Sequence, residues 1–402
     1  MMFKINKSLT TIAIFLAFFS TNLNAQKKYQ AATVAFYNVE NIFDTEISVG
    51  YIDGTLAYTD PNYHISIPAS EISKYDTVLF KQRYTYENIA GKKIIRPLIL
   101  QDEFSPDGKK RWTDERYNQK MKNISEVISR LGNEETNSAP VIVGLCEIEN
   151  RKTVEDIVAQ PALKDFDYGV VHFNSFDARG VDVALVYQKN RFEVTNAKPY
   201  VVEIYNDDGT RDYTRDILRV TGKLDGEEIT FLVNHWPSRR GGEKASMPRR
   251  KKAAEVMKGI YDEIRAENPN AKIIAMGDFN DDPVSPSIAK TLGAKSDKEK
   301  AKKEDIVNLM YNMFKKGMGT LAYRDSWNLF DQFFVTGTLI DDEKKFNSYK
   351  IFKTEIFSPS YLVSPEGQYK GYPFRMYGGD TYYANGYSDH FPVYTILLRE
   401  VN

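Results

Sequence analysis

The chain has 402 residues, 42% of them hydrophobic and 13% aromatic, so it can bury a large core and lacks the composition of a disordered protein. Its 54 Lys and Arg residues against 55 Asp and Glu residues give a net charge of −1, which argues against the overall basic field of many non-specific nucleic-acid binders. The single cysteine, Cys146, excludes an intramolecular disulfide.

Residues 1–25 have the pattern of a secretory signal peptide. Lys4 and Lys7 give a positive start, and the apolar run from Ile12 to Phe19 is too short to span a bilayer. We therefore expect an exported, periplasmic or secreted protein whose mature chain has no transmembrane segment. A retained N-terminal anchor is the alternative, because some signal peptides stay uncleaved.

After this segment, short β-branched and aromatic runs alternate with amphipathic stretches, which predicts an α/β or α+β enzyme. The spacing of apolar residues predicts helices over 117–131 and 248–267. The predicted strands are 33–37, 141–146, 181–187, 229–233, 272–276, 330–335 and 391–398. Two stretches fit this alternation poorly, and we interpret 46–100 as an insertion and 346–386 as a rim loop of one domain spanning 26–402.

Several predicted strands end on polar side chains that can bind a metal or transfer a proton. These side chains are Asn38 and Glu40, Glu147, Asn234 and His235, and Asp278 and Asn280. Polar groups at the ends of buried strands carry a desolvation cost unless they converge on a cation or a polar ligand. Each one alone also fits a turn, an ion pair or a helix cap. Together they predict a shared site.

The four histidines support this interpretation, because two of them lie at strand ends. His235 follows one predicted strand, and His390, next to Asp389, precedes another. His64 falls in the expected insertion and is interpreted as a surface residue, whereas His172 is expected to support the fold. Cys146 lies within a predicted strand and is expected to be an inert core thiol.

These segments resemble the endonuclease/exonuclease/phosphatase superfamily, which includes DNase I-like nucleases and inositol polyphosphate phosphatases, and in particular an exported bacterial branch of it. The matching segments are Asn38–Asn41, Leu145–Glu147, Arg179–Ala184, Asn234–Pro237, Gly277–Asn280, Asp331–Phe333 and Ser388–His390. The resemblance covers nearly the whole mature chain, and Gly-Asp-Phe-Asn followed by a distant Ser-Asp-His is its most specific part. It implies a DNase I-like four-layer α/β/β/α sandwich with the active site at one edge of the paired sheets.

The resemblance also implies roles for individual residues. Mg²⁺, with Mn²⁺ as a substitute, would be bound by Glu147, with Asn38, Glu40 and Asp389 nearby. Asp278 would orient and deprotonate the attacking water, and Asn280 and His235 would donate hydrogen bonds to the phosphate. Asp331 would hold His390 in position. The substrate contacts that it implies are Arg215 and Asn234. Arg239 and Arg240 are further candidates, because they belong to a local basic cluster that follows His235.

The expected function is Mg²⁺-dependent phosphoester hydrolysis by a monomer, with a phosphodiesterase or endonuclease acting on DNA or RNA ahead of the alternatives. One alternative is a phosphatase or phospholipase C-like enzyme on small or lipid phosphoesters, and another is a non-catalytic exported binding protein. Trp236 and the aromatic residues of 372–387 are candidates for stacking on bases. Those aromatics are equally well explained by packing against the core.

Overall fold

The computed structural model describes residues 27–45, 103–175, 177, 179–209, 211–340, 345–378 and 381–401, and the backbone of five short strands between 48 and 100. The expected signal peptide therefore lies outside the described residues. In the part of the chain covered by these ranges, no helix combines the length and the apolar character needed to cross a membrane.

Two six-stranded sheets form the centre of the protein. In spatial order, the first contains β20 (Lys350–Ile356), β21 (Val393–Val401), β1 (Lys28–Ile42), β7 (Ile142–Ile148), β9 (Asp182–Gln188) and β8 (Tyr168–His172). The second contains β10 (Phe192–Tyr200), β13 (Ile217–Leu224), β14 (Glu227–His235), β15 (Ile273–Asp278), β19 (Asp331–Thr336) and β16 (Ile306–Asn308). Each sheet is antiparallel except for one parallel pair, β1 with β7 and β14 with β15.

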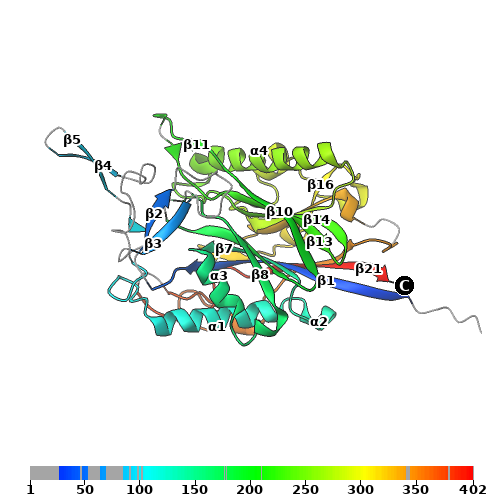
Figure 1. The fold of residues 1–402 in the computed structure, drawn as a ribbon, viewed down its shortest axis with the longest axis horizontal. Helices are drawn as coiled ribbons and strands as arrows, with labels where there is room; N and C mark the ends of the chain where they lie inside the picture. Colours follow the sequence, from blue (N-terminus) through cyan, green and yellow to red (C-terminus); the bar gives the residue numbers. More distant parts are fainter. Residues whose placement is uncertain are drawn as a thin grey trace, which may run out of the picture.

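Helices cover the outer face of each sheet. Figure 1 shows α1 (Asp114–Arg130) and α3 (Arg151–Val158) on one side of the sheets and α4 (Glu243–Glu267) on the other. The shorter helices are α2 (Asn133–Thr136) and α5 (Tyr311–Lys315). One apolar cluster lies between α1, α3 and the first sheet, one between the sheets, and one between the second sheet and α4. The predicted four-layer α/β/β/α sandwich is confirmed.

Helix α1 shows how the sequence specifies one of these layers. Its side chains Ile124, Val127 and Ile128 are fully buried, as their helical spacing predicts. The helix begins three residues earlier than predicted, because the Thr113 hydroxyl accepts a hydrogen bond from the Arg116 amide and caps the first turn. Asp114 and Glu115 then place negative charge near the helix N-terminus, where it is favourable.

The expected rim loop is only partly a loop. Residues 350–356 form β20, which pairs with β21 along the edge of the first sheet. Pattern analysis missed this strand because its side chains are mostly half-buried, so it lacks the apolar run of a central strand. We call the remainder, residues 357–378 and 381–387, the rim segment.

The described strands of the expected insertion form separate small sheets. β2 (Ser48–Ile52), β3 (His64–Pro68) and β6 (Ile99–Leu100) form one, and β4 (Thr85–Ile89) and β5 (Lys92–Arg96) form the other. Two further strand pairs are β11 (Ile204–Tyr205) with β12 (Arg211–Asp212) and β17 (Leu321–Tyr323) with β18 (Ser326–Asn328). The limits of the insertion and of the 26–402 domain stay predictions.

The glycine before Asp278 is required by the pairing of β14 with β15. Gly277 lies opposite Asn234, and a Cβ atom at Gly277 would be 2.4 Å from the carbonyl oxygen of Asn234. Because two of the three nearest atoms are backbone atoms of Asn234, little adjustment is possible. The close pairing brings the end of β15 beside the end of β14.

We expect Gly277→Ala to destabilise the protein by about 1–3 kcal/mol, the usual cost of overpacking. The measurement is chemical unfolding followed by circular dichroism. Gly259→Ala is the control, because Gly259 is exposed in α4 with open space around its Cβ position, and it should stabilise by about 0.5–1 kcal/mol. Equal stability of Gly277→Ala and wild type would contradict the steric argument.

Candidate active site

The register of the second sheet places three of the predicted catalytic residues side by side. His235 at the end of β14 pairs with Asp278 at the end of β15, and Asp278 pairs with Asp331 at the start of β19. In the first sheet, β1 and β7 bring Asn38 opposite Cys146, which directly precedes Glu147. Because β15 contacts both β1 and β7, the two groups meet at one edge of the sandwich.

The backbone leaves regular strand geometry at the residues that form the site. Glu40, Asn41, Glu147 and Asn280 have φ values of 51°, 51°, 63° and 50°, in the left-handed region that side chains disfavour. The β1–β7 register shifts between Asn38 and Ile42, and the β7–β9 register shifts between Cys146 and Ile148. Bulges of this kind turn side chains away from the strand pattern and are common next to active sites.

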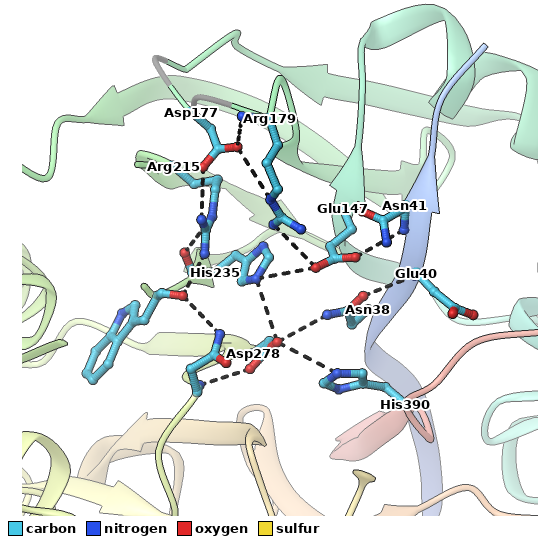
Figure 2. Close-up of polar contacts among 12 residues, drawn as sticks. Asn38, Glu40, Asn41, Glu147, Asp177, Arg179, Arg215, His235, Asp278 and His390 are labelled. Atoms are coloured by element: carbon cyan, nitrogen blue, oxygen red, sulfur yellow. Dashed lines mark hydrogen bonds and ion pairs between the residues drawn. The ribbon is translucent and has the colours of Figure 1, made fainter. Parts of the chain in front are cut away.

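Asp278 is the centre of the polar network (Figure 2). Its Oδ2 accepts a hydrogen bond of 3.1 Å from Asn38 Nδ2, and its Oδ1 accepts one of 2.9 Å from the backbone amide of Asn280. His235 Nε2 lies 3.7 Å and His390 Nε2 3.9 Å from Oδ2. Burial raises the pKa of Asp278 to about 7, although His390 acts in the opposite direction.

The two histidines differ in charge because their surroundings differ. Burial, with Arg215 and Arg179 nearby, holds the pKa of His235 well below its ordinary value. Burial also lowers the pKa of His390, but the charge of Asp331 and its 2.7 Å hydrogen bond to His390 Nδ1 outweigh this effect and raise it well above the ordinary value. These surroundings favour the neutral form of His235 and the imidazolium form of His390.

Glu147 lies opposite Asp278 and is held on both of its oxygens. Its Oε2 accepts a hydrogen bond of 3.1 Å from the backbone amide of Asn41. Its Oε1 lies 3.5 Å from Arg179 Nη2 and 3.8 Å from His235 Nε2. Figure 2 shows Glu147 and Asp278 facing the same space from the two sheets, with His235 between them. The structure therefore brings together Asn38, Glu147, His235, Asp278, Asn280, Asp331 and His390.

Two predicted metal ligands pair with an arginine, and their role as ligands stays a prediction. Arg375 of the rim segment lies 3.3 Å from Glu40 and 3.0 Å from Asp389. The second oxygen of Glu40 accepts the Met376 amide at 2.8 Å. Burial and the charge of Asp389 raise the pKa of Glu40 to about 7, while Lys120 and Arg375 oppose them.

The contacts of the predicted substrate-binding residues favour positioning roles for three of the four. Arg215 is buried and donates to the carbonyls of His235 and Trp236 and to Asp177. Asn234 is fully buried, accepts from the Trp236 indole and has no exposed surface for a substrate. Arg239 bonds the Asn280 carbonyl and pairs with Asp281 and Asp282.

Arg240 is exposed, and its substrate role stays a prediction. Trp236, a candidate for base stacking, is buried and packs on Phe279 with ring centroids 4.9 Å apart, so it is unavailable to a base.

The expectations for two other residues, Cys146 and His172, agree with the structure. Cys146 is buried and burial raises its pKa well above the ordinary value, and His172 is buried 3.2 Å from Asp182.

Pattern analysis missed four charged residues that support the site, namely Lys120, Asp177, Arg179 and Arg375. Arg179 stands inside one of the matching segments, so its presence near Glu147 could have been inferred. Lys120 lies in the middle of an amphipathic helix, where lysine is normally exposed, yet it is fully buried. Arg375 lies in a loop-like segment without any periodic signal.

The oxygen donors at the centre suit a magnesium ion. Among the described residues, no three His, Cys, Asp or Glu side chains converge closely enough to hold a metal by themselves. Mg²⁺ does not need such a cage, since it usually binds one or two carboxylates and completes its shell with water and substrate phosphate. Glu147, with the amide oxygen of Asn38 near it, fits that requirement.

Comparison with known proteins agrees with this geometry. The model of the endonuclease/exonuclease/phosphatase family matches residues 82–399. No curated protein sequence matches the chain.

Similar solved structures include a family member from Bacteroides thetaiotaomicron, with 16% identity, a TM-score of 0.46 and coverage of 93% of this chain and 100% of that one. They also include a mannosyl-6-phosphatase from the same species, with 15% identity, a TM-score of 0.45 and coverage of 91% and 99%. A third is truncated TDP2 from Caenorhabditis elegans, with 16% identity, a TM-score of 0.42 and coverage of 71% and 92%. On the extent of the family match, the chain belongs to the endonuclease/exonuclease/phosphatase family of phosphoester hydrolases.

Proposed function

We propose that the protein is a Mg²⁺-dependent phosphodiesterase. The observation that carries this proposal is the convergence of Asn38, Glu147, His235 and His390 around the buried carboxylate of Asp278. A raised carboxylate pKa next to a charged imidazole is the kind of pairing found where protons are transferred. A non-catalytic binding protein has no need of such a pair.

The residues divide the chemistry among themselves. Asp278, with its pKa near 7, accepts the proton of the attacking water. His390, charged and fixed by Asp331, donates to an oxygen of the phosphate as negative charge develops. His235 and Asn280 add neutral hydrogen-bond donors. Glu147, with Asn38, would hold Mg²⁺, which would neutralise charge on the phosphate when bound.

Aromatic side chains beside the site favour a nucleic-acid diester over a small phosphomonoester. Trp327 is 39% exposed and stacks on Phe391, the neighbour of His390, with centroids 5.9 Å apart. Tyr372 contacts Trp327 at 6.2 Å and bonds Asp325, which ties the rim segment to the β17–β18 hairpin. Exposed aromatic rings along the path of the bound nucleic acid are typical of proteins that bind single-stranded nucleic acid.

Some of the other aromatic residues of the rim segment pack against the core, and one of them is available for stacking on a base. Tyr377 is buried in the core cluster beneath the first sheet, and Tyr383 and Tyr387 pack against that cluster. Tyr382 is 68% exposed and remains available to a ligand. The basic residues of α4 give weaker support to nucleic-acid binding, since Arg249 and Arg250 pair with Asp212 and Asp281.

Glu147→Gln should weaken the apparent affinity for Mg²⁺ by at least about 10-fold and lower turnover by about 10²–10³-fold, because the amide keeps the shape but loses the charge. The assay is hydrolysis of bis-p-nitrophenyl phosphate over a Mg²⁺ titration, with an EDTA blank. Glu193→Gln, on the exposed side of β10, is the matched control. Wild-type behaviour of Glu147→Gln at limiting Mg²⁺ would exclude Glu147 as the ligand.

His390→Ala and Asp331→Ala should each lower kcat by about 10²–10⁴-fold, and the double variant should lose little more than His390→Ala alone. The reason is that Asp331 acts through its hydrogen bond to His390 Nδ1. A double-mutant cycle on kcat measures the coupling. Fully additive losses would show that the two residues act independently.

Trp327→Ala should reduce cleavage of a single-stranded oligonucleotide by about 10-fold, within the stacking energies measured for bases on aromatic rings. Hydrolysis of bis-p-nitrophenyl phosphate should stay unchanged, and Trp327→Phe should restore oligonucleotide cleavage. Tyr29→Ala is the control, because Tyr29 is 46% exposed near the opposite end of β1 from Asn38. Equal loss on both substrates would point to damage at Phe391 instead of a lost stacking contact.

A further inference from the structure

The guanidinium of Arg375 pairs with two carboxylates that neighbour the site residues Asn38 and His390 in the sequence, namely those of Glu40 and Asp389. Its Nε lies 3.3 Å from Glu40 Oε1 and its Nη2 lies 3.0 Å from Asp389 Oδ2. Two separate nitrogens are used, one for each acid, which holds the carboxylates apart at a set spacing. Arg375 itself is 32% exposed and lies over the ring of Tyr369, which supports its side chain from the rim segment.

A second cation lies beneath the same pair of acids. Lys120 is fully buried on α1, and its ammonium donates to the carbonyl of Tyr387 at 2.5 Å. Burial lowers the pKa of Lys120 to about 8, while the charges of Glu40 and Asp389 act in the opposite direction. A buried lysine without negative charge nearby would be costly, so the buried Glu40 and the half-buried Asp389 stabilise the ammonium of Lys120.

The acids of the site thus form two groups with different partners. Glu40 and Asp389 face the fixed cations Arg375 and Lys120. Glu147 faces the neutral His235 and the more distant Arg179, with Nη2 at 3.5 Å. Of the two groups, only the Glu147 side combines a carboxylate with a neutral amide and imidazole, which leaves negative charge for a divalent cation.

We propose that Arg375 is a built-in substitute for a second metal ion, so that the centre binds one divalent cation, at Glu147, while Glu40 and Asp389 are withheld from metal. This inference rests on the metal dependence of the proposed function. A cavity of about 260 Å³, lined by Glu40, Asn41, Arg375 and Met376 among others, lies beside the guanidinium. The cavity has room for a hydrated ion, and removal of the positive charge would deprive Glu40, in its lining, and Asp389, outside its lining, of their shared arginine partner.

The test is calorimetric titration of the full chain with Mn²⁺, supported by electron paramagnetic resonance to count bound ions. Wild type should bind one Mn²⁺ per chain. Arg375→Gln should bind a second, and Arg375→Gln combined with Asp389→Asn should return to one. Mn²⁺ should also raise the melting temperature of Arg375→Gln more than that of wild type, because the second ion binds only the folded state.

Two controls separate the effect of Arg375 from a general loss of charge. Arg375→Lys keeps a cation between the acids and should bind one ion. Arg191→Gln removes an arginine that pairs with Asp225 at 2.7 Å, far from the site in the sheet order, and should also bind one.

Two bound ions in wild type, or one in Arg375→Gln, would overturn the inference while leaving the proposed function intact. No binding by wild type would overturn the metal-dependent function itself. If Arg375→Gln does not fold, the ion counts of wild type and Arg375→Lys decide the question, because either one binding two ions contradicts the role of Arg375.

Discussion

The buried carboxylate of Asp278 is the constraint on which the rest of the site depends. A charge at this depth is unfavourable unless polar groups compensate it, and here the compensation comes from four places in the chain. Asn38 reaches it from β1, His235 from β14, the Asn280 backbone amide from the turn after β15, and His390 from the segment before β21. The ends of both sheets must therefore meet, and the sandwich positions them to do so.

The same requirement explains the irregular backbone at this edge. A regular strand alternates its side chains between two faces, so it cannot point consecutive functional groups into one space. The bulges at Glu40, Asn41 and Glu147 and the left-handed turn at Asn280 remove that restriction. The well-packed cores on either side of each sheet supply the stability that holds these residues in place.

Charge around the site is distributed unevenly, and this follows from which element supplies each cation. The loop between β8 and β9 contributes Arg179 and the segment before β13 contributes Arg215; together with burial, these two arginines hold the pKa of His235 well below its ordinary value. The rim segment and α1 contribute Arg375 and Lys120, which face Glu40 and Asp389. Substrate and metal thus meet a centre whose acids already differ in availability, although all of them are carboxylates at strand ends.

Local sequence patterns predicted the layers and most of the residues that meet at the candidate site. Apolar strands that end in Glu147, His235 or Asp278 predict both the central strands and a polar edge, because burial and strand polarity follow from residue type and order. Edge strands such as β20 escaped prediction because half-buried side chains give a weak pattern.

Only the tertiary structure decided that Arg239 and Arg215 bond nearby carbonyls and acids, that Trp236 is buried, and that Arg375 lies between Glu40 and Asp389. These outcomes depend on side chains that are distant in the chain, Arg375 and Glu40 being 335 residues apart. A long charged side chain can reach a phosphate, a carbonyl or a carboxylate equally well, and the neighbours that the fold brings to it determine which one it binds.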